Sequence, residues 1–540
     1  MDAVTSVPDP VNEPIRSYAP HSPERESLRR RLTELEGIRH DLTITVGGEQ
    51  RMAGGDPIEV VQPHDRHHVL GVTAQATSQD VADAVQAAKA AAPPWQNLPF
   101  DERAAVLLRA ADLLAGPWRD TLNAATMLGQ SKTVQQAEID AACELIDFLR
   151  FNVHFARRLM AEQPISSPGV WNRFDHRPLD GFVVAITPFN FTAIAGNLPL
   201  TPALLGNTVV WKPSPTQPLA AHYTMRLLEE AGLPPGVVNM VTGDGAAVSE
   251  VAMTDRDFAG LHFTGSTATF KSLWRTMASN LDTYRSYPRV VGETGGKDFV
   301  VAHDSADPAS LVTGLVRGAF EYQGQKCSAA SRAYIARSLW EGGVRERLAE
   351  VTKTLTYGDV TDFSHFGGAV IDHRAFAKHK AVLEMAAAST SIETLVGGGC
   401  DDSVGYFVEP TVLVGTDPLH EVFTTEFFGP ILSVHVYDDY EEILKVVDTS
   451  TPYALTGAVF ARDRAAIEQA HRALRFAAGN FYVNDKPTGA VVGQQPFGGS
   501  RGSGTNDKAG SIFNLQRWTS PRSVKETFVP PTDHTYPHMR

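Results

Sequence analysis

The chain has 540 residues and a formal net charge of −14 at pH 7; 43% of its residues are hydrophobic and 20% are charged. This length exceeds what one hydrophobic core supports, so two or three domains of a globular protein are expected. The net negative charge and the lack of a large basic block argue against nucleic acid as a partner.

The three cysteines, Cys143, Cys327 and Cys400, form no Cys-x-x-Cys pair and have no metal-ligand spacing, so we expect neither disulfides nor a metal site. The histidine-rich stretch at residues 64–68 lies between two strand-like runs and is interpreted as a solvated hairpin turn. No apolar run reaches membrane-spanning length, and the first residues resemble neither a signal peptide nor a transit peptide. We therefore expect a cytoplasmic protein without a membrane span.

The N-terminal part is predicted to contain an extended arm, helices and short strands. Four prolines in residues 1–21 indicate the arm, and Ser22 is expected to cap a helix with Leu28, Leu32 and Leu35 on one face. Breaks at glycine, proline and aspartate between residues 42 and 72 predict short antiparallel strands. Further helices are predicted at residues 78–92, with Ser78 as cap, at 101–116 and at 134–155.

From Gly181 the pattern becomes strand, helix, strand, which predicts a parallel doubly wound sheet. The Gly243-Asp244-Gly245 turn has only the first half of a dinucleotide fingerprint and is interpreted as a plain turn. Gly265 and Ser266 follow a strand and open a helix, where free N–H groups and a hydroxyl can bind phosphate. The predicted strands are residues 182–186, 208–211, 237–241 and 261–263, and the main helix between them is 217–231.

The C-terminal part is predicted to hold a second α/β unit and a second arm. The α/β unit extends from about residue 293 to residue 484. Residues 519–540 contain four prolines and alternating apolar residues, which is typical of an extended arm or an edge strand that needs a partner surface. The matching internal segment is expected at about residues 160–180.

Three stretches carry candidate catalytic residues. Cys327 is expected where a helical run meets a strand, but an inert buried cysteine explains it equally well on its own. Glu293 is flanked by glycines after a strand-like run, and Asn190 follows the apolar run at residues 182–186. A thiol, a carboxylate and a side-chain amide supply the nucleophile, the water-activating base and the oxyanion donor of acyl chemistry through a thioester.

In this order, the three stretches resemble the aldehyde dehydrogenase superfamily, and the resemblance extends from about residue 40 to the end of the chain. It implies an α/β fold with a Rossmann-type NAD domain, an α/β catalytic domain and a small β oligomerisation arm. The implied NAD-binding domain comprises residues 1–159 and 181–292, the catalytic domain 293–505 and the arm 160–180 and 506–540. A homodimer or a higher homo-oligomer is expected from the arm.

The same resemblance implies NAD as the cofactor. Lys212 matches the lysine on the adenosine ribose, Ser266 the serine on the pyrophosphate, and Glu426 the glutamate on the nicotinamide ribose. Pro215 stands where many relatives have a glutamate on the adenosine ribose, which leaves the choice between NAD and NADP open. The expected cofactor-binding residues are Lys212, Ser214, Gly265, Ser266, Glu426 and Phe428.

The implied mechanism begins with attack of the Cys327 thiolate on an aldehyde. The Asn190 amide and the Cys327 N–H hold the oxyanion, and hydride passes to the nicotinamide. Water activated by Glu293 then hydrolyses the thioester.

The expected substrate is glutamate γ-semialdehyde, a small molecule with a carboxylate, an ammonium group and an aldehyde. The N–H groups of Gly489 and Ala490 form a nest for the carboxylate with the Ser328 hydroxyl opposite, and Glu144 meets the ammonium group. The expected substrate-binding residues are Glu144, Phe191, Ser328, Gly489, Ala490 and Phe497. These stretches resemble the branch of the superfamily that oxidises Δ1-pyrroline-5-carboxylate in proline breakdown, which implies a functional link to proline dehydrogenase.

Three other interpretations stay open at this point. The first is a dehydrogenase for another short semialdehyde, such as succinic or aminoadipic. The second is a coenzyme-A-acylating enzyme, against which the water-activating Glu293 argues. The third is a non-catalytic binding or structural protein that keeps the fold, against which the combination of Cys327, Glu293 and Asn190 argues. Glu144 is also explained as one polar residue on a mostly buried helix.

Overall fold

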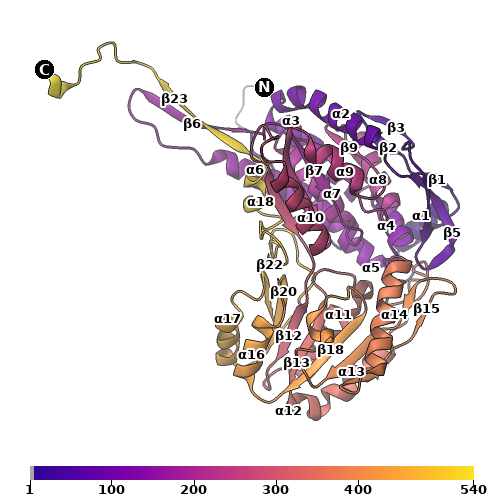
Figure 1. Ribbon diagram of the computed structural model, residues 1–540. Coiled ribbons are helices and arrows are strands. Elements are labelled where there is room, and N and C mark those ends of the chain that lie inside the picture. The colour runs from indigo at the N-terminus through magenta and orange to yellow at the C-terminus, as the bar shows by residue number, and fades with distance from the viewer. Residues whose placement is uncertain (1–4) are drawn as a thin grey trace.

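The computed structural model describes residues 5–540 and shows two α/β lobes from which a two-stranded arm projects (Figure 1). Within these residues, none of the helices is long and apolar enough to cross a membrane. No group of three or more histidine, cysteine, aspartate or glutamate side chains in the described part could hold a metal ion.

The first lobe contains a seven-stranded sheet in the order β11-β10-β7-β8-β9-β2-β3. The first five strands are parallel; β2 pairs antiparallel with β9, and β3 pairs antiparallel with β2. From β7 the sheet grows on one side through β8 and β9, and then on the other side of β7 through β10 and β11. A topological switch point therefore lies between β7 and β10. The strands are β2 (Ile44–Val46), β3 (Glu49–Arg51), β7 (Phe182–Ile186), β8 (Thr208–Lys212), β9 (Val238–Met240), β10 (Phe258–Thr264) and β11 (Arg289–Glu293).

Helices cover both faces of this sheet, and all residues of β7, β8 and β10 are buried. Alternate side chains along each strand face opposite cores, so Val183 and Val209 pack with α3, α6, α7 and α8, whereas Val184 and Val210 pack with α2 and α10. The continuous apolar runs seen in the sequence therefore correspond to strands buried on both sides. These helices are α2 (Ser78–Asn97), α3 (Phe100–Ala115), α4 (Arg119–Gln130), α6 (Glu144–Ala161), α7 (Thr192–Leu204), α8 (Pro218–Glu230), α9 (Ala246–Val251) and α10 (Thr267–Ser279).

The N-terminal arm and the first helix agree with the prediction within the described residues. Residues 5–21, which we call the N-terminal strap, contain neither helix nor strand; residues 1–4 of the predicted arm lie outside the described part. Helix α1 (Pro23–Glu36) is capped by the Ser22 hydroxyl, which accepts a hydrogen bond from the Arg25 N–H at 3.3 Å. Its leucines at 28, 32 and 35 are buried, as their spacing indicates.

Helix α2 differs from its prediction at both ends. Its cap is Thr77 instead of Ser78, because the Asp80 carboxylate three residues on accepts a hydrogen bond from the Thr77 N–H and completes a capping box. The helix also continues past residue 92 through Pro93 and Pro94. Its last turn is held by Trp95, which is buried and donates a hydrogen bond to the Ala203 carbonyl at 2.9 Å.

The predicted helix at residues 134–155 is interrupted. It comprises α5 (Val134–Ala137), a π-helical segment at Glu138–Cys143, and α6. The π segment brings the Glu138 and Asp140 side chains into the protein interior, where they meet buried cations. Such segments insert one extra residue per turn and often lie at functional sites.

The interpretation of the histidine-rich stretch was wrong for His64. A hairpin does join β4 (Pro57–Gln62) to β5 (Asp65–Ala74), and β5 also pairs in parallel with the short β1 (His40–Asp41). His64 in the turn, however, is 2% exposed and lies 3.2 Å from the Ser131 hydroxyl. Burial lowers the pKa of His64 to about 4, so the imidazole is neutral at neutral pH.

The second lobe contains another seven-stranded sheet, in the order β14-β17-β18-β13-β12-β20-β21, in which only β14 is antiparallel. The strands are β12 (Asp298–Ala302), β13 (Ala330–Ala336), β14 (Ile392–Val396), β17 (Thr411–Gly415), β18 (Ile431–Tyr437), β20 (Thr456–Phe460) and β21 (Asn480–Val483). The larger helices are α11 (Pro308–Phe320), α13 (Arg345–Lys353), α14 (His373–Ala388), α16 (Tyr440–Thr449) and α17 (Arg464–Ala473). This lobe is the predicted second α/β unit.

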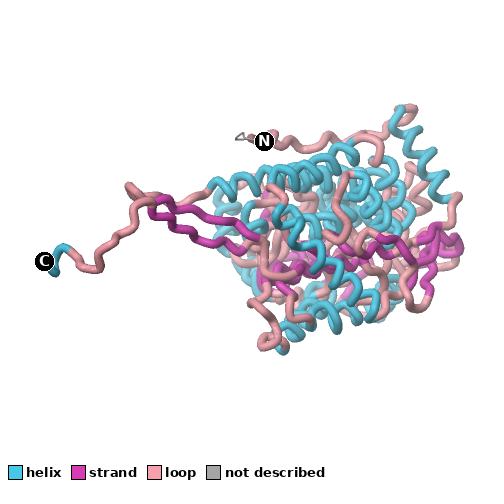
Figure 2. Tube along the Cα trace, turned by 90° about the horizontal axis from the view of Figure 1, so that it is seen from above, coloured by secondary structure: helices cyan, strands magenta, loops and turns pink. Residues whose placement is uncertain are grey.

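The arm is an antiparallel ribbon of β6 (Val170–Arg177) and β23 (Ser520–Thr527), in register from Arg177 opposite Ser520 to Val170 opposite Thr527. Figure 2 shows it extending away from the body. Residues 506–518, predicted as part of the arm, pack against the body: α18 (Ile512–Gln516) belongs to them, and Trp518 is fully buried. The arm thus leaves the body after Trp518. The division of the chain into functional domains stays a prediction.

We expect Trp518→Ala to lower the free energy of unfolding by about 3–5 kcal/mol. The change removes a fully buried indole that packs 4.7 Å from the His262 ring and leaves a cavity beside β10. Trp274→Ala on α10, where 46% of the residue is exposed, is the matched control and should change the stability less. Urea denaturation followed by circular dichroism compares the two variants, and equal midpoints would contradict the packing argument.

Candidate functional site

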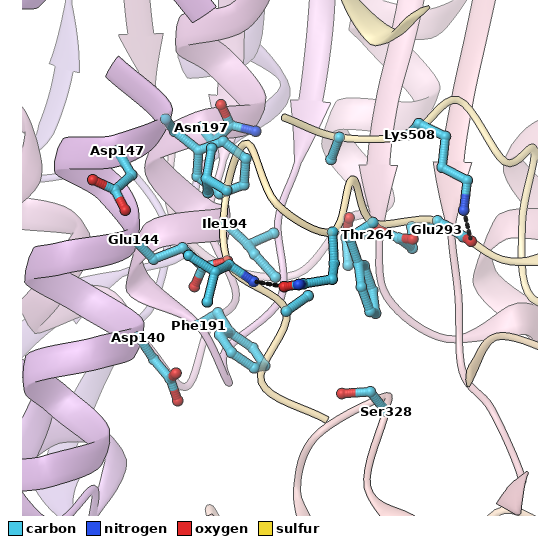
Figure 3. A pocket seen from close by; sticks show the side chains of 18 of the residues that line it. Asp140, Glu144, Asp147, Phe191, Ile194, Asn197, Thr264, Glu293, Ser328 and Lys508 are labelled. Atoms are coloured by element: carbon cyan, nitrogen blue, oxygen red, sulfur yellow. Dashed lines mark hydrogen bonds between the residues drawn. The ribbon is translucent and has the colours of Figure 1, made fainter. Parts of the chain in front are cut away.

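A cavity of about 370 Å³ lies between the two lobes, next to the ends of β10 and β11. Figure 3 shows α6 on one wall and Glu293 with Lys508 on the opposite one. We call it the main cavity. The candidate residues that line it are Glu144, Phe191, Glu293, Cys327, Ser328, Gly489, Ala490 and Phe497, which the sequence places far apart.

The loop that presents Cys327 is fixed by an unusual backbone. Between α11 and β13, Tyr322, Gln323 and Gly324 have φ values of 50°, 53° and 64°, in the left-handed region. A side chain at residue 324 would place Cβ 2.2 Å from the Gly429 carbonyl oxygen, so glycine is required there. The Gln323 amide donates to the carbonyls of Ser131 and Ala369 at 3.0 and 2.7 Å. The thiol therefore has a defined position.

The surroundings of Cys327 favour the protonated thiol. Burial raises its pKa well above the ordinary value, and the nearby carboxylates of Glu293, Asp298 and Glu426 raise it further. A thiolate at this position therefore requires a base or a positive charge that arrives with a ligand.

Glu293 is the last residue of β11, and its carbonyl accepts a hydrogen bond from the Gly265 N–H at 3.1 Å. Its Oε1 atom is buried and has no hydrogen-bond partner in the described part of the protein. Burial raises the pKa of Glu293 to about 8; Lys508 opposes this shift and Asp507 adds to it. A carboxyl group with a free buried oxygen and a pKa near 8 is suited to accept a proton from water.

Lys508 was missed as a site residue by the sequence interpretation. Its ammonium group donates to the carbonyls of Gly479 and Gly498 at 2.7 and 3.1 Å, and lies 3.2 Å from Oδ1 of Asn480. This cage of oxygens fixes a positive charge beside Glu293. In the sequence, Lys508 lies in a glycine-rich stretch at residues 502–508, where no spacing distinguishes a functional lysine from a surface one.

Asn190 follows β7 and is 3% exposed. Its amide nitrogen donates to the Gln325 carbonyl at 3.0 Å, so the amide lies against the loop that carries Cys327. The amide has a second hydrogen, which an oxyanion on the substrate would accept. The predicted role of Asn190 stays a prediction.

Cys327 also lines a second, smaller cavity, together with Glu426 and Phe428. Glu426 Oε1 accepts a hydrogen bond from the Gly296 N–H at 2.9 Å. At Gly295 a Cβ atom would come within 2.2 Å of the Glu426 carboxylate oxygens, so the glycine allows the close approach. The thiol thus lies where two cavities meet, which suits a nucleophile that must reach a substrate on one side and a cofactor on the other.

The other cofactor candidates lie at the carboxyl ends of β8 and β10, outside both cavities. Lys212 is 5% exposed, its ammonium group donates to the Gly243 carbonyl at 3.1 Å, and burial lowers its pKa to about 8. The Ser214 and Thr216 hydroxyls are 3.1 Å apart. Gly265 precedes Ser266, whose hydroxyl caps α10 by accepting from the Thr269 N–H at 3.1 Å. Ligands of doubly wound sheets bind at such strand ends, so this placement is compatible with a dinucleotide.

Glu144 begins α6 directly after the π segment and lies on the wall of the main cavity (Figure 3). Burial raises its pKa well above the ordinary value, with a further contribution from Asp140. The Lys132 ammonium lies on Asp140 and over the rings of Phe191 and Tyr322, at 4.4 and 4.3 Å from their centroids. An ammonium group in the cavity would favour the ionised form of Glu144.

Ser328, Gly489 and Ala490 form a polar end of the main cavity. The Ser328 hydroxyl lies 2.7 Å from the hydroxyl of Thr488, the residue that precedes Gly489 in the chain. Gly489 has a φ of 92°, which side chains other than glycine rarely adopt. Within residues 5–540, no acceptor receives a hydrogen bond from the N–H of Gly489 or Ala490, so both donors are available to a carboxylate.

Comparison with known proteins identifies the class. The family model described as "Aldehyde dehydrogenase family" matches residues 51–524. The chain belongs to this family, and the predicted fold class is confirmed.

Individual relatives are more specific. The mitochondrial delta-1-pyrroline-5-carboxylate dehydrogenases of Dictyostelium discoideum and Homo sapiens are 49% and 48% identical, over 99% and 98% of this chain and 97% and 94% of their own. The crystal structure of the Delta-pyrroline-5-carboxylate dehydrogenase from Mycobacterium tuberculosis bound with NAD has a TM-score of 0.97 and 63% identity, with 100% of both chains covered. The 1-pyrroline-5-carboxylate dehydrogenase from Thermus with bound NAD has a TM-score of 0.91 and 32% identity, over 97% of this chain and 100% of that one.

Glu293→Gln should make Cys327 more reactive toward iodoacetamide at about pH 9. The reason is that an ionised Glu293 raises the pKa of the thiol, and the amide does not. The rate of alkylation, followed by mass spectrometry between pH 7 and pH 10, measures this, and below the pKa of Glu293 the two proteins should converge. A slower reaction in the variant would show instead that Glu293 acts as a base on the thiol.

Proposed function

We propose that the protein oxidises L-glutamate γ-semialdehyde, which forms from Δ1-pyrroline-5-carboxylate, to L-glutamate with NAD in proline catabolism. Two findings support this activity: the relatives named for Δ1-pyrroline-5-carboxylate, and a main cavity that suits the ligand. The observation that carries it is the pair of unpaired N–H groups at Gly489 and Ala490 beside Ser328, with Glu144 on another wall and Cys327 between the cavities.

The residues of the chain perform five tasks in the proposed reaction. Gly489, Ala490 and Ser328 bind the substrate carboxylate, and Glu144 binds the ammonium group. Cys327 attacks the aldehyde, and Asn190 together with the Cys327 N–H stabilises the oxyanion; loss of one such donor typically costs about 10²–10³ in rate. Glu293 then takes a proton from the water that hydrolyses the Cys327 thioester.

The residues beside the second cavity and at the strand ends are of the kind that hold NAD. Glu426 and Phe428 would hold the nicotinamide ribose end, Ser266 with Gly265 the pyrophosphate, and Lys212 with Ser214 the adenosine ribose. When bound, NAD accepts the hydride that the substrate carbon loses. The surrounding carboxylates raise the pKa of the Cys327 thiol. The positive charge of the oxidised nicotinamide would oppose this effect and favour the thiolate.

The assembly and the location of the protein are proposals as well. The ribbon of β6 and β23 presents exposed apolar side chains, among them Trp171 at 49% and Phe174 at 39%, which favours a homo-oligomer joined through the arm. Gel filtration of an arm variant tests this. A cytoplasmic location and a functional link to proline dehydrogenase also remain predictions, and several of the relatives are mitochondrial.

The substrate is tested by comparing kcat/KM for Δ1-pyrroline-5-carboxylate, succinic semialdehyde and butanal with both NAD and NADP. We expect the first substrate to be favoured by roughly 10²-fold or more, because a bound ligand without the carboxylate displaces water from the Gly489 and Ala490 N–H groups and does not replace its hydrogen bonds. Ser328→Ala should raise KM for the semialdehyde and change propanal oxidation much less. Equal efficiency with butanal would contradict the proposed substrate but not the family.

Glu293→Gln should slow thioester hydrolysis more than hydride transfer. The variant lacks the base for water but retains Cys327, so a burst of NADH should precede a slow steady rate. Stopped-flow absorbance measures both phases, with Cys327→Ala as the control that shows neither. An equal fall in both phases would contradict the role of Glu293 in hydrolysis.

Lys508→Met should shift the pH dependence of thioester hydrolysis to higher pH. The Lys508 charge lowers the pKa of Glu293, so its removal raises that pKa above about 8, and the base is deprotonated only at higher pH. Lys508→Arg retains the charge and is the control. The midpoint is read from the steady rate between pH 6.5 and pH 10; an unchanged midpoint in Lys508→Met would exclude this effect.

A further inference from the structure

The N-terminal strap forms part of the wall of the main cavity. Asn12, Glu13 and Ile15 line it, opposite residues that lie more than a hundred positions later in the sequence. The sequence interpretation treated this segment only as an extended arm. In the structure the strap is instead one of the segments that shape the cavity.

Asn12 uses its whole side-chain amide to join three segments. Its nitrogen donates to Asp147 Oδ2 on α6 and to the Val492 carbonyl, both at 2.8 Å. Its oxygen accepts from the Gln494 side-chain amide at 2.9 Å. The strap, α6 and the loop of residues 488–497, which we call the anchor loop, are thus linked through one side chain.

The strap itself is held firmly on α6. The Glu13 N–H donates to Asp147 Oδ1 at 2.7 Å, so both oxygens of Asp147 bind the strap. The Glu13 carboxylate bridges Arg119 at 2.5 Å and Arg150 at 2.8 Å. The backbone next to Asn12 is therefore fixed where its side chain forms hydrogen bonds with the anchor loop.

The anchor loop has little structure of its own. It contains neither helix nor strand, and Gly489 and Gly493 have positive φ values of 92° and 81°. Its internal hydrogen bonds run mainly between Val491 and Gln495, with the Val491 N–H donating to the Gln495 side chain at 3.0 Å. A loop with such freedom presents two N–H groups in a fixed direction only if it is held from outside.

We propose that Asn12 is a positioning residue for substrate recognition: it holds the anchor loop so that the Gly489 and Ala490 N–H groups converge on the substrate carboxylate. This inference rests on the proposed function. Asn12 acts through the loop and touches neither the thiol nor the reacting carbon. It should therefore affect ligands that carry the carboxylate and spare aldehydes that lack it.

The test uses Asn12→Ala and Asn12→Asp in the full chain. The introduced carboxylate would keep an acceptor for Gln494 but lose both donors and bring a second acid to Asp147, so Asn12→Asp should be the more damaging change. Val11→Ala is the matched control, because Val11 is the neighbouring strap residue and 74% of it is exposed. Gln494→Ala removes the hydrogen bond between Gln494 and Asn12 by a change in the anchor loop. This variant provides the test if the Asn12 variants do not fold.

In steady-state assays with NAD, Asn12→Ala should lower kcat/KM for Δ1-pyrroline-5-carboxylate by about tenfold or more, mainly through KM, and change propanal oxidation by less than about twofold. Isothermal titration should show a matching loss of affinity for glutamate, which carries the same carboxylate.

An equal loss for both substrates, or no loss, would overturn the role of Asn12. The result for the unmodified protein separates the two proposals. If that protein showed no preference for the semialdehyde, the proposed function would fail. If it showed the preference and Asn12→Ala and Gln494→Ala kept it, only the positioning role would fail.

Discussion

The geometry of the site depends on the left-handed turn at Tyr322, Gln323 and Gly324. Two of these residues carry side chains in a conformation that typically costs about 1 kcal/mol or more each, so the turn must be held by its surroundings. Two of the holding contacts come from the other lobe: the Tyr322 hydroxyl donates to the Gln130 carbonyl at 3.0 Å, and the Gln323 amide to that of Ser131. The position of the Cys327 thiol therefore depends on how the two lobes pack together.

Much of the fold was predictable because burial on both faces gives a strand a continuous apolar run, as in β7 and β8. The predictions were wrong where contacts with residues distant in the sequence determine the local structure. Thr77 and Ser78 are equally good caps by type, and only the capping-box partner selects the first. The helix passes Pro94 because Trp95 finds an acceptor on α7, and His64 is buried by residues that the local sequence does not reveal.

The candidate site divides in the same way. Cys327, Glu293 and Asn190 lie in local motifs at element ends, and the structure brings the first two into one cavity with the third against the thiol loop. Lys508 and Asn12 were not found, since neither has a local pattern. Lys508 is held by carbonyl oxygens of distant residues. Asn12 forms hydrogen bonds with α6 and with the anchor loop, 480 residues later in the chain.

Two glutamates with the same ordinary pKa serve different purposes on opposite walls of the main cavity. Burial raises the pKa of both, that of Glu293 to about 8 and that of Glu144 well above its ordinary value. In the proposed reaction the ammonium group of the substrate favours ionisation of Glu144, while Glu293 lies beside Lys508, a positive charge of the protein itself. Glu144 thus responds to whether the right ligand is bound, whereas the ionisation of Glu293 is set by the enzyme. In the proposed reaction, that separation would let one cavity both bind an amino acid and hydrolyse the thioester that it forms with Cys327.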